Sequence, residues 1–261
     1  MPSPVDPPTC DYLLTFVTSS EEKALKSAVK ARGLPWKRQS SIHGDFYDLG
    51  TLGTSHVVAI KTTMGALGPS GAISSAHFYF EKTRATGLIS IGMAFGLSRT
   101  QQVPGTVLVS EALFPYDDRV VRPVEGAFEY TYKDKSAVPC KEDLLRIFRA
   151  YATARSVDKD GFKHQFGVLL SGSAKVECTA YRDQLFRWCG QFGSLIGGEM
   201  EGVALLSLRK DWAGIIVKGI CDFAEDGQVE EVKQHRTLAC TNAAQFAINA
   251  LALWNPDVSE A

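Results

Sequence analysis

Residues 213–222 read Ala-Gly-Ile-Ile-Val-Lys-Gly-Ile-Cys-Asp, and this stretch does most to define the fold. A short, almost continuous apolar run between glycine and acidic residues predicts a buried strand. Asp222 then leaves the strand at its C-terminal end. Ligands of open α/β sheets bind at that end, so we expect Asp222 to lie beside a ligand.

A second acidic cluster precedes this strand, in Gly197-Gly198-Glu199-Met200-Glu201-Gly202. It is predicted to open a helix, whereas Asp222 ends the next strand. Cleavage of a glycosidic bond needs one carboxyl group that donates a proton and another group that stabilises a sugar cation. Acidic residues that meet at one edge of a sheet therefore indicate cleavage of a glycosidic bond.

Strands and helices alternate along the rest of the chain. Apolar and β-branched runs predict strands at residues 12–18, 46–49, 56–60, 87–92, 106–110 and 166–170. Helical spacing predicts helices that begin near residue 19 and that cover residues 72–80, 140–155, 179–189 and 239–254. No linker interrupts this order, so we predict one α/β domain at 11–255, a flexible tail at 1–10 and a C-terminal tail at 256–261. Residues 114–135 are polar and turn-rich, which predicts a long loop at a functional rim.

The composition argues against several classes of partner. The chain has 28 basic and 29 acidic residues, so neither a nucleic acid nor a membrane surface is an expected partner. Its six scattered cysteines form no C-x-x-C pair and predict reduced thiols. The N-terminus shows no signal-peptide pattern. We therefore expect a cytoplasmic protein.

Several common enzyme signatures are absent, among them the Walker A loop, G-x-G-x-x-G, G-x-S-x-G and H-E-x-x-H. Five weaker motifs do occur in order. They are Val17-Thr18, the glycine loop at 64–68, Ile91-Gly92-Met93-Ala94-Phe95-Gly96, the segment 105–111 and Lys218-Gly219-Ile220-Cys221-Asp222. Together with Ser171-Gly172 and Glu199-Met200-Glu201, they resemble the nucleoside phosphorylase and nucleosidase family, and most closely its methylthioadenosine/S-adenosylhomocysteine nucleosidase branch. Phe114-Pro115-Tyr116 and Ile196–Gly202 also resemble bacterial members associated with defence proteins.

The resemblance implies a mixed, strongly bent, barrel-like sheet flanked by helices. It also implies a homodimer or larger homo-oligomer that takes a small purine nucleoside or nucleotide and needs no metal or organic cofactor. The expected reaction releases a free, adenine-type base. Some relatives keep the fold as storage or sensing proteins, so a silent nucleoside-binding role is an alternative.

The resemblance also assigns roles at the site. Asp222 is expected to protonate purine N7, which requires a pKa raised by partial burial. Glu201 is expected to bind the ribose hydroxyls, with Met200 packed against the sugar and Glu199 beside them. An aromatic residue near Phe166 or Phe192 is expected at the base. Cys221 stands where many relatives have serine, and a thiol is the weaker hydrogen-bond partner.

The nucleophile depends on two further positions. The family places a water-activating glutamate just after the first strand, and our choice is Glu22, with Glu21 as the alternative. Both acids also suit a helix N-terminus, which is the structural explanation for them. Similar phosphorylases hold phosphate with an arginine and a serine that flank the glycine corresponding to Gly92. In this chain those two positions are Ser90 and Met93. Ser90, Gly92 and Met93 are all expected at the substrate site. Water is therefore favoured, and a phosphorylase is the alternative.

The ribose 5′ substituent is left open by the sequence. A thioalkyl group requires an apolar pocket, whereas a phosphate requires cations. Tyr116, Arg119 and Arg122 are candidates for either environment. Ordinary solubility of a loop explains the two arginines equally well.

Overall fold

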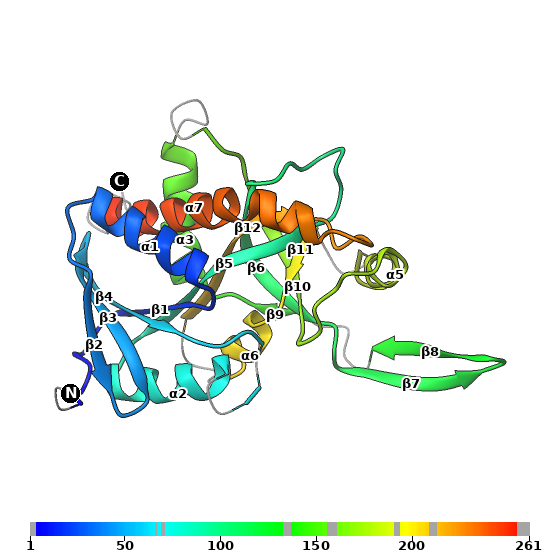
Figure 1. The fold of residues 1–261 in the computed structure, drawn as a ribbon, viewed down its shortest axis with the longest axis horizontal. Helices are drawn as coiled ribbons and strands as arrows, with labels where there is room; N and C mark the ends of the chain where they lie inside the picture. Colours follow the sequence, from blue (N-terminus) through cyan, green and yellow to red (C-terminus); the bar gives the residue numbers. More distant parts are fainter. Residues whose placement is uncertain are drawn as a thin grey trace.

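A computed structural model describes residues 4–65, 67–68, 71–132, 137–155, 161–190, 194–208 and 213–254 of the chain. It shows a mixed sheet with helices on both faces and a small hairpin that projects from the body (Figure 1). The sheet strands are β1 (Tyr12–Phe16), β2 (Lys37–Ser41), β3 (Gly44–Leu52), β4 (Ser55–Lys61), β5 (Gly87–Gly96), β6 (Val107–Pro115), β9 (Val138–Pro139), β10 (His164–Ser171), β11 (Leu195–Glu199) and β12 (Ala213–Asp222).

Five strands of this sheet form a closed ring, β5-β12-β6-β10-β11, in which β11 pairs back onto β5. The sheet continues from β5 through β1, β4, β3 and β2. The double glycine makes the closure possible. A side chain at Gly198 would lie 2.2 Å from the Phe95 ring, and one at Gly197 would lie 2.5 Å from the Phe95 carbonyl oxygen. The prediction of a mixed, barrel-like sheet is confirmed.

The helices form two layers around the sheet (Figure 1). Helices α1 (Ser19–Ala31), α3 (Glu142–Ala154) and α7 (Val229–Leu253) pack together on one face, where α7 covers β12 and β5. Helices α2 (Ala72–Thr83) and α6 (Gly202–Leu206) lie against the other face, and α5 (Thr179–Cys189) lies near the end of the barrel. The core between α1, α3, α7 and the sheet is apolar, as at Leu25, Phe148 and Phe246.

The hairpin corrects the prediction of a long loop at 114–135. Residues 119–132 form the antiparallel strands β7 (Arg119–Val124) and β8 (Ala127–Tyr132). Valine and aromatic residues favour these strands, and Gly126, with a φ of 71°, forms the turn between them. The prediction was wrong because the charged residues hid this hairpin pattern.

The ends of the domain differ in what the structure describes. Within the predicted tail 1–10, the Val5 amide donates a hydrogen bond to the Ser40 carbonyl, and Cys10 is buried. Residues 256–261 lie outside the described part of the chain. None of the helices described here is long and apolar enough to cross a membrane.

Candidate active site

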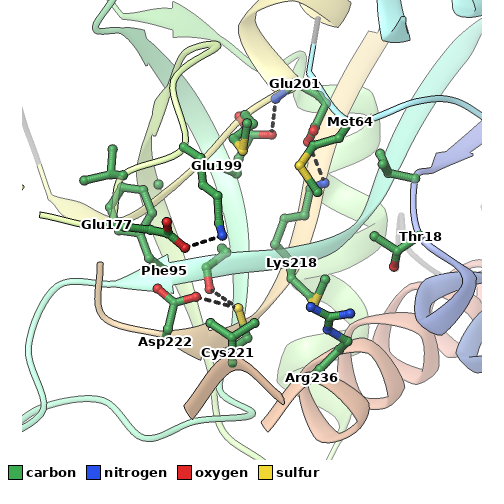
Figure 2. A pocket seen from close by; sticks show the side chains of 18 of the residues that line it. Thr18, Met64, Phe95, Glu177, Glu199, Glu201, Lys218, Cys221, Asp222 and Arg236 are labelled. Atoms are coloured by element: carbon green, nitrogen blue, oxygen red, sulfur yellow. Dashed lines mark hydrogen bonds and ion pairs between the residues drawn. The ribbon is translucent and has the colours of Figure 1, made fainter. Parts of the chain in front are cut away.

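One pocket opens where β12, β11 and β1 end, and α7 forms one of its walls (Figure 2). Its empty space is about 850 Å³ with the open mouth included. The residues that line it and carry the following argument are Thr18, Glu21, Met93, Phe95, Glu199, Met200, Glu201, Lys218, Cys221, Asp222 and Arg236. Both sequence-predicted acidic clusters therefore meet in one cavity.

Asp222 lies at the C-terminal end of β12, as the sequence predicted. Its Oδ1 accepts a hydrogen bond from the Ala224 amide at 2.9 Å, and its Oδ2 accepts one from the Cys221 thiol at 2.8 Å. Burial raises the pKa of Asp222 despite these two hydrogen bonds. The carboxyl group is thus suited to keep a proton at a higher pH than an exposed aspartate.

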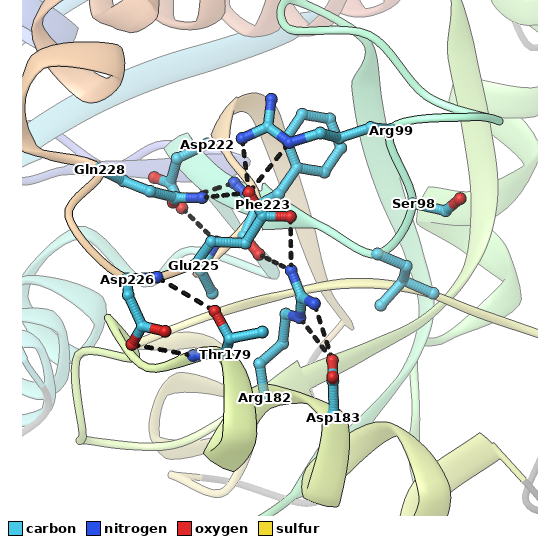
Figure 3. A network of polar contacts seen from close by, with 12 residues as sticks. Ser98, Arg99, Thr179, Arg182, Asp183, Asp222, Phe223, Glu225, Asp226 and Gln228 are labelled. Atoms are coloured by element: carbon cyan, nitrogen blue, oxygen red, sulfur yellow. Dashed lines mark hydrogen bonds and ion pairs between the residues drawn. The ribbon is translucent and has the colours of Figure 1, made fainter.

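A polar network fixes the loop that follows Asp222 (Figure 3). Arg99 bonds Glu225 and Glu231, and Arg182 bonds both Glu225 and the Phe223 carbonyl oxygen. Hydrogen bonds from Arg99, and then from Arg182, lower the pKa of Glu225 to about 2. This network links the loop to α5 and to α7, so it holds Asp222 at the pocket wall.

The turn at 199–202 orients the second acidic cluster. The Glu199 carboxylate accepts hydrogen bonds from the Glu201 amide at 3.0 Å and from the Gly202 amide at 2.9 Å. Burial raises the pKa of Glu199, which is only 2% exposed. Its oxygens are thus engaged by the backbone, whereas Glu201 projects towards Lys218 (Figure 2).

Lys218 occupies the middle of this cluster. Its Nζ lies 3.3 Å from Glu201 Oε2, and both side chains are almost fully buried. Burial by itself lowers the pKa of Lys218, but the carboxylates of Glu201, Glu199 and Glu21 outweigh burial and raise it. The lysine therefore remains charged and compensates acids that would otherwise be costly to bury.

Replacing this cation is expected to destabilise the fold. In Lys218→Met the buried carboxylates lose their counter-ion, and we expect the free energy of unfolding at pH 7 to fall by about 3 kcal/mol. The loss should shrink at lower pH, because the unpaired carboxyl groups then take up protons. Urea denaturation measures both effects. Lys233→Met, at an exposed lysine on α7, is the matched control, and equal stability of the two variants would contradict the prediction.

Glu21 enters the pocket from the start of α1. Thr18 and Glu21 form a capping box, in which the Glu21 carboxylate accepts hydrogen bonds from the Thr18 and Val17 amides, each at 2.7 Å. A Cβ at Gly92 would lie 2.4 Å from Glu21 Oε1 and 3.0 Å from Lys218 Nζ. Gly92 therefore leaves space for the Glu21 and Lys218 side chains to approach β5.

Glu22, which the sequence favoured over Glu21 as the base, does not belong to the described pocket lining. Its carboxylate accepts hydrogen bonds from the Tyr47 hydroxyl at 2.8 Å and from Lys61 Nζ at 3.1 Å. Burial opposes the shift, but these two hydrogen bonds lower the pKa of Glu22. One residue along a helix rotates a side chain by about 100°, which takes Glu22 away from the pocket.

Other predicted residues divide in the same way. Met93 and Met200 line the pocket, whereas Ser90 is buried within β5 and Phe166 packs against the core beside His164. Neither Ser90 nor Phe166 belongs to the described pocket lining. The alternative aromatic residue, Phe192, lies outside the described residues.

The candidates for the 5′ substituent also lie away from the described lining of the pocket. Tyr116 is buried and donates its hydroxyl proton to the Ala174 carbonyl at 2.5 Å. The Arg119 guanidinium lies 4.3 Å from the centre of the Tyr130 ring, and Arg122 is exposed on β7. Sequence reasoning did not identify Lys218 or Arg236 as site residues, although a lysine within an apolar strand is itself a signal of a buried partner.

The family comparison covers almost the whole chain. A model of the phosphorylase superfamily matches residues 13–252. Among curated proteins no significant match is found.

Solved structures share the fold at low sequence identity. The 5′-methylthioadenosine/S-adenosylhomocysteine nucleosidase of Neisseria meningitidis, in complex with methylthio-immucillin-A, has a TM-score of 0.74 and 15% identity over 94% of this chain and 100% of that chain. The S-adenosylhomocysteine nucleosidase of Streptococcus pyogenes, in complex with 5-methylthiotubericidin, has a TM-score of 0.75 and 16% identity over 95% of this chain and 98% of that chain. Futalosine hydrolase of Helicobacter pylori has a TM-score of 0.71 and 14% identity over 92% of this chain and 95% of that chain.

Proposed function

Because the chain belongs to the phosphorylase superfamily, we propose that it is an N-ribosyl hydrolase that releases the base of a purine nucleoside or nucleotide. One observation carries the proposal. An acid with a raised pKa, Asp222, and the buried cluster of Glu21, Lys218 and Glu201 face the same pocket. The similarity to purine nucleosidase structures favours an adenine-type base.

Asp222 is the proposed general acid. As the bond between C1′ and the base breaks, electrons move into the purine, and protonation at N7 makes the base a better leaving group. A carboxyl group that still carries its proton near neutral pH can supply that proton. The raised pKa of Asp222 supports this role.

Glu201 is the proposed ligand of the ribose 2′- and 3′-hydroxyls. Its carboxylate is held by Lys218 and by the Gly65 amide, which donates to Oε1 at 3.2 Å. Hydrogen bonds to a carboxylate strengthen as the sugar ring gains positive charge, so they favour the transition state over the ground state. Met200 contributes an apolar wall beside the sugar, and Glu199 orients this turn through its bonds to the Glu201 and Gly202 amides.

Glu21 is the proposed base that takes a proton from the attacking water. Its carboxylate is fixed by two backbone amides and lies near Lys218, which is the geometry of a positioned base. The three carboxylates of Glu21, Glu199 and Glu201 face one another around Lys218. A phosphate dianion that attacked C1′ from this side would meet these carboxylates, which favours water as the nucleophile.

The test is a base-release assay on adenosine, methylthioadenosine, AMP and ATP, with and without inorganic phosphate. We expect free base without phosphate, together with a free ribosyl product. Strict dependence on phosphate would replace the hydrolase by a phosphorylase. No base release from any of the four substrates, combined with measurable binding, would favour a storage or sensing role.

A further inference from the structure

Among the cations of the described pocket lining, Arg236 is the one that pairs with no described carboxylate. It projects from α7, and its Nε is buried without a hydrogen-bond partner in the described part of the chain. The two lysines of the lining are paired, Lys218 with Glu201 and Lys175 with Glu177. Arg236 has no ion pair with any described residue. A buried guanidinium nitrogen without a partner is costly, which indicates that a ligand supplies the missing acceptor.

The position of Arg236 shows which part of a ligand it meets. Figure 2 places Asp222, Glu201 and Arg236 at three separate corners of the pocket. In the same view Arg236 lies on the side of the pocket that also carries Thr18, apart from Asp222.

The proposed function fixes two of these corners. A nucleoside with its base at Asp222 and its 2′,3′-diol at Glu201 has one exocyclic group left, the 5′ carbon. The remaining wall carries Arg236 and Thr18. The Thr18 hydroxyl oxygen accepts a hydrogen bond from the Glu21 amide, and its own proton can still be donated to a ligand.

We propose that Arg236 binds a 5′-phosphate, so that the substrates of this site are purine nucleoside 5′-phosphates rather than neutral nucleosides. This inference rests on the proposed function for the orientation of the substrate. A planar guanidinium forms paired, charge-assisted hydrogen bonds to phosphate oxygens, which a thioalkyl group cannot accept. The free energy of those bonds would be lost for adenosine and for methylthioadenosine.

The experiment compares AMP with adenosine in the wild-type protein, in Arg236→Gln and in Lys233→Gln, an exposed cation on the same helix. We expect the wild-type protein to prefer AMP. In Arg236→Gln we expect kcat/KM for AMP to fall about 30- to 100-fold, while the value for adenosine changes less than threefold. Lys233→Gln should leave both unchanged. Equal losses for AMP and adenosine, or no loss for AMP, would overturn the assignment.

Calorimetric titration with ribose 5-phosphate and inorganic phosphate, neither of which carries a base to release, tests the site without turnover. Ribose 5-phosphate should bind the wild-type protein and should bind Arg236→Gln at least tenfold more weakly. If no base is released but this difference is found, the hydrolase proposal fails and the phosphate site stands. If inorganic phosphate stimulates base release from adenosine and Arg236→Gln abolishes that stimulation, Arg236 holds a free phosphate and the 5′ assignment is wrong.

Discussion

Replacing Asp222 by Asn is expected to lower kcat for base release about a thousand-fold, which is within the range for loss of a general acid. The amide keeps the size of the side chain and can still accept the Ala224 hydrogen bond. It has no proton to give to the departing purine. Steady-state release of free base by the purified variant measures the effect, and KM should change far less than kcat.

The pH dependence of the wild-type enzyme provides a second readout of Asp222. Because burial raises its pKa, the catalytically active, protonated form persists above the usual range of aspartate. We expect kcat to decrease as the pH rises through the folded-state pKa of Asp222. A kcat for Asp222→Asn within tenfold of the wild-type value would refute the assignment of the acid.

A stability measurement separates this effect from misfolding. Between the unfolded and the raised folded pKa of Asp222, the folded state binds more protons, so the stability it contributes is lost as the pH rises. Asn carries no charge to bury, and we expect Asp222→Asn to be at least as stable as the wild-type protein at pH 7. Asp226→Asn, at an exposed acid on the same loop, is the control and should retain activity within threefold.

Much of the fold could be predicted from local patterns. The apolar run at 213–222 forms β12 with Asp222 at its end, and the double glycine allows the barrel to close against Phe95. The spacing at 239–254 predicted only the later part of α7, which begins at Val229. The earlier turns carry Arg236 and mix polar with apolar residues, so no regular stripe marked them as helix.

Where neighbouring residues were equally plausible members of the site, only the three-dimensional structure shows which side chain faces the pocket. Thr18 and Glu21 match the capping-box spacing, a sequence signal that would have predicted the return of the Glu21 carboxylate to the start of α1. Phe166 could not be excluded in the same way. The face of β10 that it occupies depends on pairing with β6 and β11, whose registers are irregular at neighbouring residues.

The comparison of Glu21→Gln with Glu22→Gln tests the proposal that Glu21 is the base. We expect Glu21→Gln to lower kcat about a thousand-fold, because an amide cannot take a proton from water. It also weakens a capping box, at a stability cost of about 1 kcal/mol. Glu22→Gln removes an ion pair with Lys61 that is partly exposed, so its kcat should stay within threefold and its stability within about 1 kcal/mol of wild type.

The two variants change adjacent residues by the same atoms, so each is the control for the other. Their pH profiles should also differ. Wild type and Glu22→Gln should lose activity at acidic pH, where the base becomes protonated, whereas the residual activity of Glu21→Gln should lack that acidic limb. If Glu22→Gln were the inactive variant, Glu22 would be the base and the assignment of Glu21 would be wrong. Helix α1 would then have to move upon substrate binding to bring Glu22 into the pocket. If both variants instead kept the wild-type kcat, neither glutamate would activate water. Glu201, which also lies beside Lys218, would then be the carboxylate to test next.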